Sequence, residues 1–303
     1  MAREFTVLSS DGALLSGEES GNGTPVLLLH GLTATRRYVV MGSRLLERSG
    51  HRVITYDARA HGRSSAAPEE HAYTYDLLAQ DAIAVLDRLG VERAVIAGAS
   101  MGAHTALNVA LHHPARVAGL VVITPAYPGA DGGLLRGQPG EVGDRETGEP
   151  GRTDAWDSHQ DRWEALSEGL RRGGVDGFMA AFGQPAVSSA QVAQTILTVT
   201  RQRLSQHQDL RALADCLRWL PRSQPFGSLD ELRVIDVPCT VVISSDQADP
   251  DHPEAVGAAY ARSLPAAQMV TDQPGSSPVA WQGSQLSKVI AAVAARAMAA
   301  KTT

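Results

Sequence analysis

Five short apolar runs, separated by stretches long enough to hold helices, constrain the fold of this chain more than any other feature. Each is rich in valine, isoleucine or leucine and lacks polar alternation, which is typical of strands buried on both faces of a parallel sheet. The runs are VLLLH at 26–30, VITYD at 53–57, AVIAGA at 94–99, GLVVI at 119–123 and TVVIS at 240–244. Alternation of such strands with helices predicts an α/β protein with a mostly parallel sheet and right-handed crossovers.

Two local patterns support this architecture. Between the second and third runs, YDLLAQDAIAVLDRLG repeats apolar side chains at helical spacing and ends at Gly90, which predicts a helix. Near the N-terminus, EFTVL and ALLSGEES flank Asp11 and Gly12, a plausible hairpin turn. We therefore expect an antiparallel edge before the parallel strands.

The regular alternation stops after Ile123. From about Tyr127 the chain becomes a long loop rich in glycine and acidic residues, and then DRWEALSEGLRR and SAQVAQTILTVTRQRL read as helices. We interpret 127–231 as a helical insertion above a core formed by 1–126 and 232–303.

The composition narrows the class of protein. The chain has 303 residues, 43% of them hydrophobic, and a formal net charge of −6, so no basic excess is present to displace counterions from nucleic acid. No apolar run approaches the roughly 18 residues of a membrane span, and the N-terminus lacks the apolar core of a signal peptide. We expect a cytoplasmic protein with a small-molecule partner, no nucleic acid, no membrane and no metal or organic cofactor. Cys216 and Cys239 have no metal-type spacing and read as buried apolar side chains.

The most informative stretch for function is GASMG, in which the third run ends at Gly98 and Ala99 and a helical pattern begins directly after Ser100. Small residues around a serine are what a sharp strand-to-helix turn requires, because crowding there leaves no room for larger side chains. Ser100 would lie at a helix N-terminus, which favours developing negative charge. We predict that Ser100 is a nucleophile.

Two further motifs agree with this interpretation. In LLLHGLTAT, His30 and Gly31 end the first run, and the backbone amide of Leu32 could point at the same oxyanion as the amide of Met101. DARAHGRS follows the second run. Together, HGLTAT, DARAHGRS and GASMG resemble the α/β-hydrolase superfamily in order and spacing, over about residues 5–125 and again from 232 to the end.

The resemblance implies roles for these segments. The three motifs would be an oxyanion-hole loop, a structural turn and the nucleophile elbow, and the insertion would be a helical cap. A serine nucleophile argues against relatives that use aspartate there. His30 and His61 would brace loops, and His104 would pack beside its helix. The catalytic acid usually follows the strand after the cap, where Asp249 fits best and Asp246 is the alternative.

The family normally carries its catalytic histidine after the last strand, near AAQMV. The loop that follows reads TDQPGSSPVAW, and no histidine occurs after His252. His252, three residues after Asp249, could serve as the base from the acid loop. A base could instead come from the insertion, where His159 and His207 lie in polar sequence that reads as solvated helix ends. A third possibility is that no base exists.

The interpretation that follows is a serine hydrolase acting on a small carboxylic ester. Ser100 would be the nucleophile, His252 the base, and Asp249 or Asp246 the orienting acid. The alternatives are a ligand-binding relative without activity, a C–C bond hydrolase, an acyltransferase or a lyase. The aromatic and methionine side chains of the insertion read as core packing; they are Trp156, Trp163, Phe178, Met179 and Phe182. The sequence gives no indication of the oligomeric state.

Overall fold

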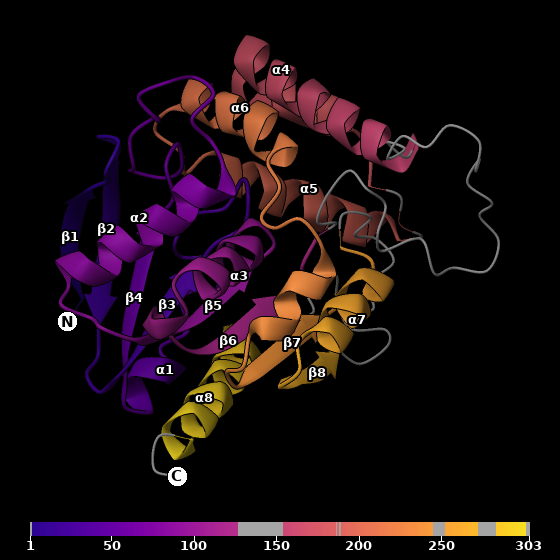
Figure 1. Ribbon diagram of the computed structural model, residues 1–303. Coiled ribbons are helices and arrows are strands. Elements are labelled where there is room, and N and C mark those ends of the chain that lie inside the picture. The colour runs from indigo at the N-terminus through magenta and orange to yellow at the C-terminus, as the bar shows by residue number, and fades with distance from the viewer. Residues whose placement is uncertain are drawn as a thin grey trace.

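The computed structural model describes residues 2–126, 154–185, 187, 189–244, 252–271 and 283–300, with only the backbone described at 154–158. Within these residues the strands form one sheet of eight, in the order β1-β2-β4-β3-β5-β6-β7-β8 (Figure 1). The strands are β1 (Arg3–Leu8), β2 (Leu14–Ser20), β3 (Thr24–Leu29), β4 (His51–Asp57), β5 (Ala94–Ala99), β6 (Val117–Ile123), β7 (Cys239–Ile243) and β8 (Ala267–Thr271).

The predicted antiparallel edge is confirmed. β1 and β2 form a hairpin with Arg3 opposite Glu19, and β2 also pairs antiparallel with β4. The turn contains Gly12 at a φ of 96°, a left-handed conformation that glycine adopts without steric cost. From β4 to β8 every neighbouring pair is parallel. The fold is therefore the α/β architecture that the apolar runs predicted.

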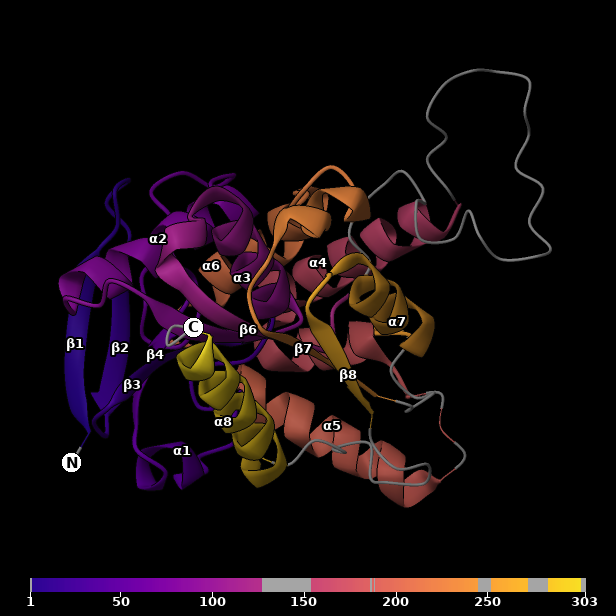
Figure 2. The same ribbon diagram turned by 60° about the horizontal axis from the view of Figure 1, so that its bottom comes forward.

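Helices cover both faces of the sheet. Helices α2, α3 and α7 lie on one face of the sheet, and α1 and α8 lie on the other (Figure 2). Their buried side chains form the two hydrophobic clusters that pack against these faces. The helix predicted between the second and third apolar runs is present as α2. It begins after Thr74, whose hydroxyl accepts a hydrogen bond from the Leu77 amide, and it ends before Gly90, which has a φ of 63°. The helices are α1 (Leu45–Arg48), α2 (Tyr75–Arg88), α3 (Met101–His112), α4 (Asp154–Phe182), α5 (Ala190–Leu204), α6 (Leu210–Trp219), α7 (Glu254–Ser263) and α8 (Gly283–Ala299), with 3₁₀ turns η1 (Pro114–Arg116), η2 (Leu220–Arg222) and η3 (Leu229–Val234).

Helices α4 to α6 occupy the segment interpreted as an insertion. α4 is kinked at Gly174, whose φ is 57°, and α4 and α6 run side by side at the top of Figure 1. One side of α6 packs on α4, and the other packs on side chains that follow β4 and β5, among them Ala58 and Met101. α6 therefore lies over the carboxyl ends of the parallel strands. The boundaries of a separate cap stay a prediction.

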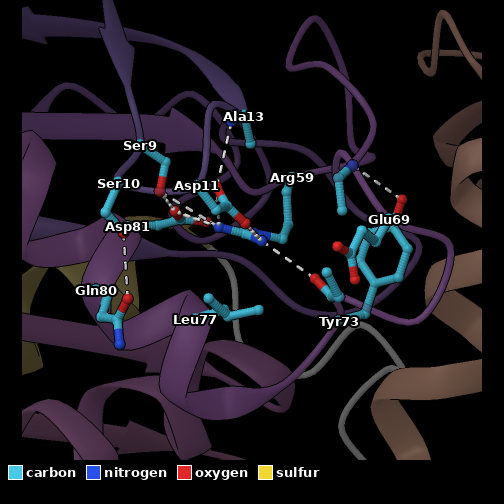
Figure 3. Close-up of polar contacts among 12 residues, drawn as sticks. Ser9, Ser10, Asp11, Ala13, Arg59, Glu69, Tyr73, Leu77, Gln80 and Asp81 are labelled. Atoms are coloured by element: carbon cyan, nitrogen blue, oxygen red, sulfur yellow. Dashed lines mark hydrogen bonds and ion pairs between the residues drawn. The ribbon is translucent and has the colours of Figure 1, made fainter.

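The turn after β4 is held by a buried ionic cluster around Arg59 (Figure 3). The Arg59 guanidinium is inaccessible to solvent and donates to Asp81 of α2 at 2.7 and 2.8 Å and to Asp11 of the hairpin turn at 2.6 Å. Ser9 donates to the same Asp81 carboxylate. One side chain thus joins the hairpin, the DARAHGRS turn and a helix, in keeping with a structural role for that motif.

Candidate active site

Ser100 lies between β5 and α3 in a conformation that few residues adopt. Its φ is 52° and its ψ is −111°, so the chain reverses sharply from strand to helix at this residue. A Cβ on Gly98 would lie 2.0 Å from the carbonyl oxygen of Gly102, and a Cβ on Gly102 would lie 2.1 Å from that of Leu29. Backbone approaches this close exclude any side chain, which explains the two glycines of the motif.

The turn is fixed to its neighbours on both sides. The Ser100 amide donates to the carbonyl of Ile123 at the end of β6, at 3.0 Å. On the other side, a Cβ on Gly31 would lie 3.4 Å from the Cβ of Ser100, so the loop after β3 packs directly against the serine. Ser100 is half-buried and stands at the N-terminus of α3, where unpaired amides favour negative charge.

The two amides expected to bind an oxyanion belong to the residues next to these contacts. Met101 is the first residue of α3, and Leu32 follows Gly31 in the loop that touches Ser100. Thr33, the next residue, has a φ of 69° and is buried, so this loop is also sharply turned. The pairing of the Leu32 and Met101 amides as an oxyanion hole stays a prediction.

His252 is the histidine that lies against the serine. Its Nε2 atom is 2.8 Å from Ser100 Oγ, although the two residues are 152 positions apart in the chain. His252 is half-buried and stands just before Pro253, which caps α7. Among the histidines weighed as a base, the described hydrogen bonds bring this one to the serine hydroxyl, at a distance suited to proton transfer.

His207 requires a correction. The polar sequence around it predicted a solvated helix end, but its side chain is 8% exposed and hydrogen-bonded at both nitrogens. Nδ1 accepts the Gly62 amide, and Nε2 donates to the carbonyl of Thr33, each at 3.0 Å. Burial lowers its pKa to about 4, so the ring is neutral at pH 7. His207 connects the segment before α6 to the two core loops and makes no described contact with Ser100.

The other histidines considered in the sequence analysis make contacts away from the Ser100 hydroxyl. His159 accepts the indole N–H of Trp163 on the same helix, at 3.0 Å. His30 accepts the amide of Ala58 at 2.9 Å, which fits the loop-bracing role that was expected. His61 lies 2.9 Å from the Arg59 carbonyl through Nδ1 and is likewise buried, and its pKa is far below the usual value because of that burial. His104 is buried within its helix, as predicted.

Several predicted features lie outside the described residues. They include both candidate acids, Asp249 and Asp246, and the segment PGSSPVAW at 274–281. Of the five large apolar side chains of the insertion, Phe178 is 2% exposed and Trp163, Met179 and Phe182 pack on its cluster, so those four are core as expected, while the side chain of Trp156 is not described. Both cysteines are buried, and burial raises the pKa of Cys239 to about 12.

The described parts of the chain contain neither a candidate metal-binding cluster nor a candidate membrane-spanning helix. No group of three or more histidine, cysteine or acidic side chains there is arranged to hold a metal ion. Of the helices in those parts, none is both long enough and apolar enough to cross a bilayer.

The amino-acid sequence is similar to those of known α/β-hydrolase proteins over part of its length. Residues 24–145 match the family model described as alpha/beta hydrolase fold. The chain is similar to the sn-1-specific diacylglycerol lipase ABHD11 of Danio rerio, with 36% identity over 104 residues, 34% of this chain and 32% of that protein. The chain spans less than half the length of the curated relatives that it matches first.

Solved structures extend the similarity over almost the whole chain. An alpha/beta hydrolase from Sphaerobacter thermophilus superposes with a TM-score of 0.63 and 26% identity, over 95% of this chain and 99% of that one. A thermophilic esterase from Thermogutta terrifontis superposes with a TM-score of 0.70 and 22% identity, over 99% and 98% of the two chains. At 22% identity, the similarity to the esterase shows a shared fold only.

Proposed function

Because this chain belongs to the α/β-hydrolase superfamily, we propose that it is a serine hydrolase that cleaves a small carboxylic ester through an acyl-enzyme. The observation that carries the proposal is the 2.8 Å contact between Ser100 Oγ and His252 Nε2, at a serine held in a strained strand-to-helix turn. A serine hydroxyl is a weak nucleophile until a base takes its proton, and an imidazole at this distance is that base.

In the first half of the reaction, Ser100 Oγ attacks the ester carbonyl while His252 Nε2 accepts the hydroxyl proton. The amides of Leu32 and Met101 donate to the oxyanion of the tetrahedral intermediate. The imidazolium then protonates the departing alcohol, which leaves an acyl group on Ser100. In the second half, His252 activates a water molecule that releases the carboxylic acid and frees the serine.

The base must hold its own proton on the far nitrogen while Nε2 is unprotonated. A carboxylate that accepts from Nδ1–H would fix this tautomer and stabilise the imidazolium. We assign this role to Asp249, with Asp246 as the alternative, because both precede His252 in the same loop of the sequence. Helices α4 to α6, a proposed cap, would select the substrate by covering the carboxyl ends of the strands.

Ester cleavage is a reaction for which this site holds the required nucleophile and proton carrier. The histidine beside Ser100 can protonate an alkoxide leaving group, which ester cleavage requires. A solved structure of the same fold is described as an esterase, and a sequence relative as a lipase. Both descriptions support an ester substrate.

Covalent labelling and ester turnover test the proposal together. A fluorophosphonate should form an adduct on Ser100 and none in Ser100→Ala. With short p-nitrophenyl esters, His252→Ala should lower kcat/KM by about 10³-fold or more. His71→Ala is the matched control, because that side chain is 69% exposed, and it should turn over normally.

Absence of any adduct on the unmodified chain would contradict an activated serine. Near-normal turnover in His252→Ala would remove His252 from the mechanism while leaving the nucleophile in place. Labelling without turnover of any ester would point instead to C–C bond hydrolysis or acyl transfer at the same serine.

A further inference from the structure

A chain of buried hydrogen bonds runs beneath the proposed site. His104 lies one helical turn after Ser100 on α3 and is 3% exposed. Its Nδ1 atom is 3.1 Å from the hydroxyl of Tyr75, and its Nε2 atom is 2.9 Å from the hydroxyl of Tyr260 on α7. The Tyr260 hydroxyl is also 3.4 Å from the carbonyl oxygen of Ala126. These hydrogen bonds therefore join α2, α3, α7 and the backbone just after β6.

The directions of these bonds follow from their ends. The Ala126 carbonyl oxygen can only accept, and it lies 3.3 Å from His104 Nε2 as well as 3.4 Å from the Tyr260 hydroxyl, so Nε2 carries a proton and the Tyr260 hydroxyl donates to the carbonyl. The Tyr260 oxygen is left to accept from His104 Nε2–H. Nδ1 is then unprotonated and accepts the Tyr75 hydroxyl. This arrangement needs a neutral ring, and burial lowers the pKa of His104 to about 4. Every member is satisfied, which makes such a network rigid.

Helix α7 is held at two positions on one side. Gly257 approaches β7 so closely that a Cβ there would lie 2.0 Å from Cγ2 of Ile243. Tyr260, three residues later and on the same face, makes the bond to His104. The helix begins at Glu254, so its first turn follows His252 almost directly. The position of His252 consequently depends on where these two contacts place α7.

We propose that Tyr260 and His104 are a positioning pair that fixes helix α7, and with it His252, relative to the helix that begins at Ser100. The inference rests on the proposed role of His252 as the base. α3 and α7 lie on the same face of the sheet, and the bond between His104 and Tyr260 joins them directly. Neither residue touches the reacting atoms; the pair sets the distance between Ser100 Oγ and His252 Nε2.

Tyr260→Phe removes one hydroxyl and keeps the ring. We expect kcat for a p-nitrophenyl ester to fall about tenfold or more while KM stays within about twofold, because misplacement of a base slows chemistry more than binding. The rate of fluorophosphonate labelling at Ser100 should fall by a similar factor. Tyr73→Phe is the matched control: it also removes a buried tyrosine hydroxyl with a backbone partner, the Ala67 amide, and should keep the original kcat.

Two further measurements separate this inference from the proposed function. The ¹⁵N resonance of His252 Nε2, which reports its contact with Ser100, should shift in Tyr260→Phe and stay unchanged in Tyr73→Phe even if the chain hydrolyses no ester. Tyr75→Phe weakens the pair from the other side of His104 and should shift the resonance in the same direction. An unchanged resonance in both Tyr260→Phe and Tyr75→Phe, or equal losses of kcat in Tyr260→Phe and Tyr73→Phe, would overturn the proposal.

Discussion

At Gly98 the backbone leaves no room for a methyl group, and the same is true at Gly102. The sequence alone could predict this, because both glycines flank a serine at the end of an apolar run. It could not predict the environment of His207, because the partners of that ring are the backbone of Gly62 and Thr33, 145 and 174 positions away. Backbone partners carry no signature in the sequence, so a buried histidine among polar neighbours reads as a solvated one.

Gly98→Ala should destabilise the chain and abolish the reaction of Ser100 with a fluorophosphonate. The new Cβ would lie 2.0 Å from a backbone oxygen, and relief of that overlap must shift the turn, at a cost of about 3 kcal/mol in the free energy of unfolding. Urea denaturation and fluorophosphonate labelling measure the two effects. Gly173→Ala is the control, since nothing lies within 4 Å of a Cβ there, and its stability should change by less than about 1 kcal/mol. Normal labelling in Gly98→Ala would contradict the geometry.

The two candidate acids can be separated by isosteric substitution. Asp249→Asn should lower kcat by about 10³-fold or more, because the amide cannot stabilise the imidazolium or fix its tautomer. Asp246→Asn should leave kcat within about threefold, and steady-state kinetics on p-nitrophenyl acetate compares the pair. The reverse result would assign the role to Asp246. Normal rates in both variants would leave His252 without either carboxylate.

At the scale of elements, the strands and the hairpin follow from apolar runs and turn residues, and these predictions are confirmed. The sequence does not predict which buried charged side chains connect these elements. Arg59 is part of a recognisable motif, yet nothing in the sequence pairs it with Asp81 and Asp11, which lie in a helix and a distant turn. The kink of α4 at Gly174 was also difficult to predict, because the residues around it favour a helix. The adjacent glycines Gly173 and Gly174 are the one weak indication of a kink in that stretch of sequence.

Arg59→Met should destabilise the chain strongly. It leaves the fully buried Asp81 carboxylate without its cation, an arrangement that typically costs about 3–5 kcal/mol. Arg233→Met provides the control, because the Arg233–Asp230 pair is exposed on both sides, and its effect should stay below about 0.5 kcal/mol. Chemical denaturation at pH 7 gives both values. A loss under about 1 kcal/mol in Arg59→Met would show that Asp81 finds another partner or protonates.

At the scale of the whole molecule, four buried histidines make stability depend on pH. Burial lowers the pKa of His30, His61, His104 and His207, to about 4 in the last two. As the pH drops below about 6.5, these four rings therefore bind more protons in the unfolded chain than in the folded one, so the stability that they contribute is fully present above about pH 6.5 and is lost toward lower pH.

His104 and His207, whose pKa values are about 4, each contribute a slope of about 1.4 kcal/mol per pH unit between about pH 6.5 and pH 4. We expect urea midpoints to decrease steadily from pH 7 to pH 4.5. His207→Gln removes one titrating ring and should flatten the slope by about that amount. A midpoint that is constant over the same range would mean that these rings are charged or exposed in the folded chain.

The two atoms joined by the 2.8 Å contact at the site are separated by 152 positions in the chain. On a ribosome that adds roughly 5–20 residues per second, Ser100 is synthesised about 8–30 s before His252. A nascent chain therefore carries the serine for that interval without its partner imidazole. The proposed reactivity is withheld by the order of synthesis until His252 has been made and has docked against Ser100.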